Sequence, residues 1–115
     1  MRKPFVPAVV PAEGERYTGP IVAGLGMTEF SGSDCYAYEV VEVKDQKHVT
    51  VRQLDHEMRP GALSYSNDWD LISDDSVKSR ELVKYGDIWF WKFGNRRLKA
   101  NVSFGRAEYY FDYEF

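Results

Sequence analysis

From Ile21 onward, the sequence consists of short apolar runs separated by turn-forming residues, and this spacing constrains the fold more than any other feature. No window shows a sustained helical repeat of 3.6 residues. Aromatic residues make up 16% of the chain, and flat or branched side chains suit the half-buried surface of a sheet. We therefore expect a mainly β protein, and its 115 residues are enough for a single core.

Alternating apolar and polar residues between turn formers mark the expected strands. The predicted strands are 27–30, 35–43, 48–52, 69–72, a hairpin of 80–84 with 88–93 that turns at Tyr85-Gly86-Asp87, then 98–102, and a half-buried strand at 109–115. In the long strand 35–43, alternation puts Val40 on one face and Val41 and Val43 on the other. Residues 57–68 indicate a long loop, and a short helix over 76–85 is the alternative to the first strand of the hairpin.

Closing into a barrel is the common way for five to seven short antiparallel strands to hide their edges. We therefore predict one domain over residues 20–115, a small, strongly bent barrel of the Src-homology type. Four of the five prolines lie in the first twenty residues, where missing amide donors and fixed φ disfavour helix and ladder formation. Residues 1–19 are predicted to be an extended, proline-rich arm.

Few residues could carry catalysis. Nothing near Cys35 would lower the pKa of its thiol, so we expect a packed cysteine. His48 lies on the polar side of its strand, and His56 is expected to be solvated between two carboxylates. The sequence shows neither a nucleophile elbow nor a glycine-rich phosphate loop. We expect no catalytic residue and no cofactor, and a metal-dependent hydrolase is the remaining enzyme hypothesis because carboxylates alone can bind a cation.

The acidic turn between residues 68 and 75 is the only candidate metal site. It holds four carboxylates within eight residues, and hard cations prefer oxygen ligands. The helix–loop–helix calcium pattern is absent, and one cysteine with two histidines is too few for a closed structural zinc site. We expect a solvated acidic turn without a metal.

The formal net charge of −3 conceals two segments of opposite charge. Residues 54–75 carry six acids against one base, net −5, and residues 78–106 carry eight bases against two acids, net +6. Such opposed patches suit a protein partner, because arginine and aromatic residues are enriched at interface centres and an acidic patch can occupy a basic groove. The residues predicted to bind a partner are Asp68, Asp70, Asp74, Asp75, Arg96, Arg97, Lys99 and Arg106.

The basic segment also supports a nucleic-acid alternative, in which bases stack on aromatic side chains and cations hold the phosphates. The residues predicted for this alternative are Lys92, Arg96, Arg97, Lys99 and Arg106, interleaved with Trp89, Trp91, Phe93 and Phe104. The competing explanation is that these aromatic residues fill the barrel while the basic residues keep its surface soluble.

Three motifs carry a resemblance to a known group of proteins. They are Ser33-Asp34-x-x-Ala37-Tyr38-x-Val40-Val41-Glu42-Val43, then Val49-Thr50-Val51-x-x-x-Asp55, and Tyr109-Tyr110-x-Asp112-Tyr113-x-Phe115. Over about residues 24–115, the chain resembles small uncharacterised β-rich accessory proteins encoded by phages and prophages. The match departs between residues 57 and 84, where spacing in the group varies, so no site in that stretch is implied.

The resemblance implies a phage-type accessory protein, and small proteins of this kind without catalytic constellations often act by occupying a host macromolecule. We therefore expect a cytoplasmic protein that binds a host protein or ribonucleoprotein complex, such as an anti-CRISPR inhibitor that occupies a nuclease complex. A single cysteine fits a reducing compartment, and no membrane partner is expected. The alternative is a small β-barrel module that binds RNA or single-stranded DNA through residues 89–106.

Overall fold

The computed structural model describes residues 1–12, 14–61 and 69–110 of the chain. Within these ranges the regular structure is entirely β, with no helix. The strands are β1 (Arg2–Pro4), β2 (Gly26–Ser31), β3 (Asp34–Asp45), β4 (His48–Gln53), β5 (Asp55–Met58), β6 (Trp69–Asp74), β7 (Arg80–Tyr85), β8 (Ile88–Phe93), β9 (Arg96–Ala100) and β10 (Val102–Phe104). The alternative of a helix over 76–85 is wrong, because β7 occupies residues 80–85 and the residues before it, 76–79, are not helical.

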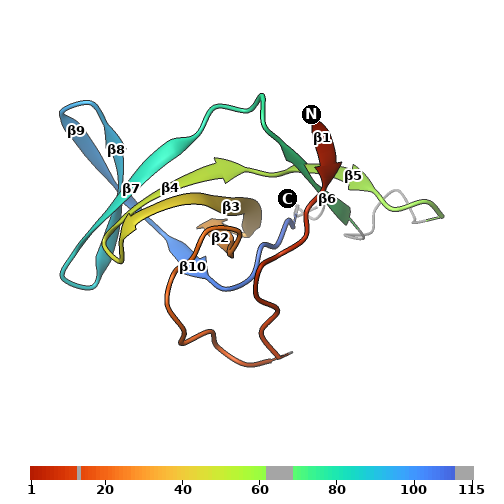
Figure 1. The fold of residues 1–115 in the computed structure, drawn as a ribbon, viewed down its shortest axis with the longest axis horizontal. Helices are drawn as coiled ribbons and strands as arrows, with labels where there is room; N and C mark the ends of the chain where they lie inside the picture. The colour runs from red at the N-terminus through yellow and green to blue at the C-terminus, as the bar shows by residue number, and fades with distance from the viewer. Residues whose placement is uncertain (13, 62–68, 111–115) are drawn as a thin grey trace.

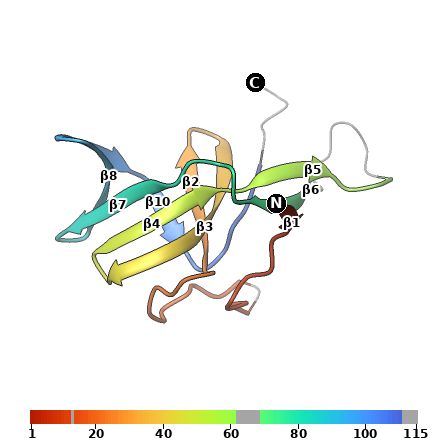
Figure 2. The ribbon, with the colours of Figure 1, turned by 45° about the horizontal axis from the view of Figure 1, so that its top comes forward.

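Seven strands form one strongly curled antiparallel sheet in the order β10-β2-β3-β4-β7-β8-β9, which makes a half-barrel (Figures 1 and 2). The other three strands form a small sheet in the order β1-β6-β5, beside the half-barrel. The predicted mainly β, strongly bent, barrel-like architecture is therefore confirmed. The small sheet is an addition that alternation along the sequence does not reveal.

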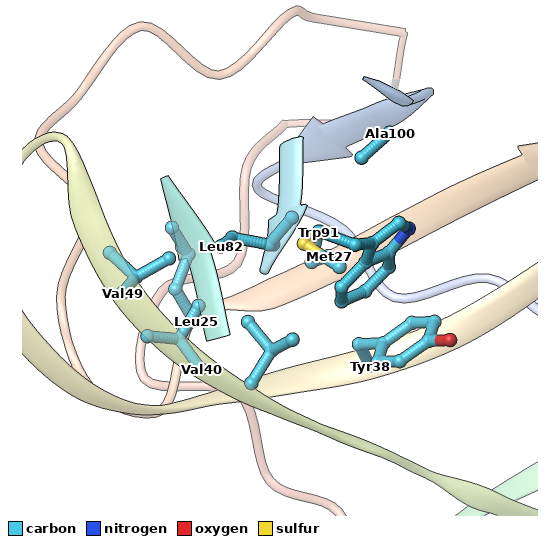
Figure 3. Packing of buried hydrophobic residues seen from close by; sticks show 9 residues of the cluster. Leu25, Met27, Tyr38, Val40, Val49, Leu82, Trp91 and Ala100 are labelled. Carbon is cyan, nitrogen blue, oxygen red and sulfur yellow. The ribbon is translucent and has the colours of Figure 1, made fainter. Parts of the chain in front are cut away.

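The core lies inside the curl of the large sheet (Figure 3). Its buried residues come from the segment before β2 and from six strands, and they are Leu25, Met27, Tyr38, Val40, Val49, Val51, Leu82, Trp91 and Ala100. The rings of Tyr38 and Trp91 pack side by side, with centroids 5.5 Å apart. Burial of these apolar side chains is the main favourable contribution to folding of the half-barrel.

A β-bulge in β3 changes which face its side chains occupy. Val40 lies opposite Val51, and Val43 lies opposite Val49, so the register shifts around Val41. The inserted residue brings Val43 back to the core face, where it packs against the buried cluster. The prediction that Val43 lies on the face opposite Val40 is wrong, because alternation alone cannot show an inserted residue.

The hairpins β7–β8 and β8–β9 each turn through two residues. In both turns the first residue is a glycine, Gly86 with φ +61° and Gly94 with φ +57°, and the residue that follows has negative φ. This is the type II′ geometry, whose twist matches that of the paired strands. The hairpin predicted at Tyr85-Gly86-Asp87 is confirmed.

Three predicted segments differ from the structure at their ends. The strand predicted over 98–102 is divided, because Asn101 separates β9 from β10 and accepts a 2.8 Å hydrogen bond from the amide of Phe30. The predicted loop 57–68 begins later, because β5 continues to Met58, and residues 62–68 lie outside the described residues. Of the predicted strand 109–115, the structure describes only the part up to Tyr110, which forms a bridge with β3.

The beginning of the proline-rich arm is a strand. β1 pairs antiparallel with β6, with Arg2 opposite Asp74 and Pro4 opposite Ile72. The prediction that proline keeps the whole arm out of any ladder is wrong here, because β1 is an edge strand and Pro4 is its last residue. Arg2 also donates hydrogen bonds to Asp55 at 2.5 Å and to Glu57 at 2.9 Å.

The rest of the arm is held along the body. The amide of Ala8 donates to the carbonyl of Gly24 at 3.0 Å, and the guanidinium of Arg106 donates to the carbonyl oxygens of Pro11, at 2.9 Å, and Ala12. At the end of the arm, the side chain of Gln46 forms two hydrogen bonds with the backbone of Ile21. The arm is thus docked on the body at several points.

Candidate binding surface

Exposed apolar and basic side chains gather on β7, β8 and β9. Outside the arm, the exposed large apolar residues that the structure describes are Phe30, Tyr85, Ile88, Phe93, Leu98 and Tyr110, and four of these six belong to β7–β9. We use the term hairpin surface for these four and the exposed cations beside them: Tyr85, Ile88, Lys92, Phe93, Arg96, Arg97, Leu98 and Lys99. The hairpin of β8 and β9 projects from the body at the left of Figure 1.

The register divides the hairpin surface between two faces. Residues directly opposite each other in an antiparallel pair share a face. Lys92 lies opposite Arg97 and Phe90 lies opposite Lys99, and these side chains occupy the outer face together with Tyr85. Ile88 lies opposite Tyr85 and shares the outer face with it, whereas the inner face, which continues the core, carries Phe93, Arg96 and Leu98.

Leu98 is the exposed end of a row of side chains that begins in the core. Leu82, Trp91 and Leu98 form one row across β7, β8 and β9 on the inner face. Leu82 is fully buried and Trp91 is 4% exposed, but Leu98 is 58% exposed. Because no strand of the described residues lies beyond β9, the last apolar side chain of the row is left exposed.

Two arginines lie over aromatic rings at this surface. The Arg97 guanidinium is 4.5 Å from the centroid of Tyr85, and Tyr85 in turn meets Phe90 edge-on at 5.9 Å. On the inner face, the Arg80 guanidinium lies 3.8 Å from Trp91 and 5.1 Å from Phe93. Cation–π contacts of this kind hold guanidinium groups in defined positions, so part of the surface is ordered before any partner binds.

The outer edge of β9 has free backbone groups. Phe93 and Arg96 flank a two-residue turn, which makes them a hydrogen-bonded pair. By alternation, the backbone groups of Arg96, Leu98 and Ala100 face β8, and those of Arg97 and Lys99 face outward. No strand of the described chain lies on that side of β9.

A network around Glu29 supports the inner face. One carboxylate oxygen accepts a 3.0 Å hydrogen bond from the Tyr38 hydroxyl, and the other accepts a 3.0 Å bond from the indole nitrogen of Trp91. Arg80 donates to the Tyr38 hydroxyl at 3.3 Å. Burial first, and then the nearby Glu29 charge, raise the pKa of Tyr38 to about 12. Sequence reasoning missed this network, because its members are far apart in the chain.

The predicted acidic residues bind cations of the chain itself. Asp70 pairs with Arg59 at 3.1 Å, and Asp75 pairs with the amino group of Met1. Asp74 accepts hydrogen bonds from the hydroxyl and amide of Ser76 and from Arg2. The pKa values of Asp74 and Asp75 are lowered, chiefly by Ser76 and by the amino group respectively. Asp68 lies outside the described residues.

The predicted basic residues separate into two groups. Arg96, Arg97 and Lys99 lie together on β9, and none of the three forms an ion pair within the part of the chain that the structure describes. Lys92 lies beside them and pairs weakly with Glu81 at 3.7 Å. Arg106 is not part of this group, because its guanidinium holds the arm.

The predicted interleaved aromatic residues are mostly in the core. Trp91 is buried, and Trp89 packs on Phe104 with centroids 5.1 Å apart against the core cluster. Phe93 alone among them is exposed, at 42%. The exposed ring on the outer face is Tyr85, which sequence reasoning treated only as a turn residue.

The structure defines the surroundings of two candidate catalytic groups, Cys35 and His56. Burial, followed by the charges of Glu108 and Asp34, raises the pKa of the Cys35 thiol, which is partly exposed. His56 is not solvated as predicted, because its ring stacks on Tyr109 with centroids 3.6 Å apart and meets Trp69 edge-on at 4.9 Å. Among the described residues, no group of three potential ligands is placed to hold a metal ion.

Comparisons with known proteins do not add to this geometry. No family model, no curated protein and no solved structure matches the chain. The described residues also contain no helix long and apolar enough to cross a membrane.

Proposed function

We propose that this chain is a non-catalytic binding module that contacts an acidic protein partner through the hairpin surface. The observation that carries this proposal is the gathering of exposed apolar and basic side chains on one projecting hairpin. Exposed apolar side chains that cluster in this way mark interaction sites, and interface centres are enriched in aromatic residues and arginine.

The expected charge of the partner follows from which charged side chains of this chain already form internal ion pairs. Arg2 binds Asp55, Glu57 and Asp74, so three acids of the acidic segment are already engaged by the arm. The cations of β9 have no such internal partners among the described residues. The basic part of the predicted partner-binding set is therefore the part that this proposal retains, and complementarity requires negative charge on the partner.

The narrower form of the proposal concerns the host. The resemblance to phage-encoded accessory proteins supports a partner that is a host protein or ribonucleoprotein complex in the cytoplasm, including a nuclease complex of CRISPR defence. In this form the protein acts by occupying a surface of that complex, without chemistry of its own.

Single-stranded nucleic acid is the second candidate partner. Tyr85 and Phe90 lie on the outer face together with Arg97 and Lys99, so bases could stack on rings while cations hold phosphates. In this case, the double substitution of Arg96→Ala with Arg97→Ala should weaken binding and flatten its dependence on salt. Unchanged binding by that variant would exclude this candidate.

A capture experiment from nuclease-treated bacterial lysate tests the proposed function. We expect the wild-type protein to retain one acidic protein, and a variant with Arg96→Glu and Arg97→Glu to lose it. A matched variant with Lys3→Glu and Arg16→Glu makes the same change of charge on exposed residues of the arm and should retain the partner. Loss of every partner on nuclease treatment favours the nucleic-acid candidate, and retention by the hairpin variant contradicts the assigned surface.

A further inference from the structure

We propose that the partner binds as an extended strand along the free edge of β9, where it becomes the eighth strand of the large sheet. The occupant is an extended peptide segment in which acidic residues alternate with apolar ones. This inference rests on the proposed function, and it adds the mode of binding and the pattern of the bound segment.

The backbone of β9 provides the template. The amide and carbonyl groups of Arg97 and Lys99 face outward, two residues apart, which is the spacing that an antiparallel strand pairs with. Neither amide donates a hydrogen bond within the described residues. Peptides that add to a sheet edge take their affinity from such main-chain hydrogen bonds and their specificity from alternate side chains.

The side chains of β9 determine which residues of the bound segment are acidic and which are apolar. On the outer face, Arg97 and Lys99 would lie opposite residues of the added strand, and opposite charges there are favourable. On the inner face, Leu98 lies between them, 58% exposed, at the end of the apolar row that starts at Leu82. An apolar residue opposite Leu98 would cover it and continue the core of the half-barrel.

Charge complementarity also excludes a second copy of β9 as the occupant. Pairing β9 with itself would bring Arg96, Arg97 and Lys99 of one chain against the same cations of the other. Like charges directly opposite each other destabilise a sheet, and basic residues on an edge strand are a common protection against self-association. An acidic segment converts the same residues into attractive contacts.

Backbone methylation of a probe peptide tests the mode of binding. The probe is a short, capped peptide of alternating glutamate and valine, and its affinity is measured by titration calorimetry. In the proposed pairing, the glutamate amides face β9 and the valine amides face solvent. Methylation of the glutamate nitrogens should therefore weaken binding at least about tenfold, because it removes the hydrogen bonds to β9. Methylation of the valine nitrogens, the matched control, should change the affinity much less.

A pair of protein variants gives an independent readout. Lys99→Pro removes the ammonium group and, of the backbone groups, only the outward amide, which the β8–β9 ladder does not use, and proline is tolerated at such edge positions. We expect Lys99→Pro to bind the unmethylated peptide several-fold more weakly than Lys99→Ala, which removes the same charge and keeps the amide. Hydrogen exchange of the Arg97 and Lys99 amides in the wild-type protein should slow when the peptide is added.

The outcomes separate this inference from the proposed function. Equal binding by the two methylated peptides, or no binding of the unmethylated peptide, overturns strand addition. If the lysate partner is lost by the variant with Arg96→Glu and Arg97→Glu but bound equally by Lys99→Pro and Lys99→Ala, docking occurs through side chains. In that case the proposed function stands and the strand-addition inference falls.

Discussion

Substitution of Glu29 by alanine should destabilise the half-barrel strongly, although this side chain is neither apolar nor fully buried. Its carboxylate accepts hydrogen bonds from two core rings, those of Tyr38 and Trp91. Glu29→Ala would leave the indole N–H of Trp91, which is 4% exposed, without an acceptor. Hydrogen bonds to charged groups contribute about 1.5–3 kcal/mol each, and partial exposure of Glu29 places the expected sum near the lower limit, at about 3 kcal/mol.

Urea unfolding at pH 7, followed by tryptophan fluorescence, measures this loss. A change of about 3 kcal/mol lowers the melting temperature by roughly 10 °C in a domain of this size. Glu29→Gln keeps one acceptor and should lose about half as much stability. The matched control is Glu42→Ala, on the exposed face of β3, for which we expect a change within about 0.5 kcal/mol.

A loss of less than about 1 kcal/mol for Glu29→Ala, or a loss equal to that of Glu42→Ala, would refute the reasoning. The pKa of Tyr38 gives a second check, because it is raised to about 12 by burial and then by Glu29. Spectrophotometric titration should show a lower pKa for Tyr38 in the Glu29→Ala variant. It should stay above the ordinary value, since burial is the larger cause.

Two further predictions concern the arm. The pKa values of the carboxylates near Arg2 are lowered in the folded state, so their stabilising effect is complete above about pH 4 and is lost as the pH falls below it. Arg2→Ala should therefore lower the melting temperature at pH 7, and an equal difference at about pH 3 would contradict the assigned ion pairs. In urea unfolding, Gly86→Ala should lower the free energy of unfolding by about 1 kcal/mol, and Gly105→Ala should lower it by more. Both glycines have positive φ, but a Cβ on Gly105 would collide with Tyr17, whereas Gly86 has open space.

Much of the fold was predictable because its signals are local. The β7–β8 hairpin follows from Tyr85-Gly86-Asp87 between two alternating segments, and β3 from its long apolar run. The bulge at Val41 was not predictable, since an inserted residue leaves no mark in composition. Docking of β1 was missed for a different reason: it depends on Arg2 meeting carboxylates that lie far along the chain.

The candidate surface was predicted in part. The cations of β9 form a continuous run, Arg96-Arg97-Leu98-Lys99, so their grouping follows from the sequence. The exposure of Leu98 does not follow from the sequence, because it depends on where the large sheet ends. The assignment of the acidic residues to partner binding could not foresee that the arm binds two of them, Asp74 and Asp75.

The ion pairs that Arg2 forms with Asp55, Glu57 and Asp74 have a consequence for the order of folding. Arg2 and Asp74 are 72 positions apart, whereas β5 and β6 come from one short stretch of chain. Closing a long loop costs entropy that contacts with already folded neighbours must offset, so we expect β1 to join last, onto a hairpin that has already formed. Contacts that form after the transition state of folding slow unfolding, and they leave the folding rate almost unchanged. We therefore expect the docked arm to slow unfolding of the native protein without changing how fast it folds.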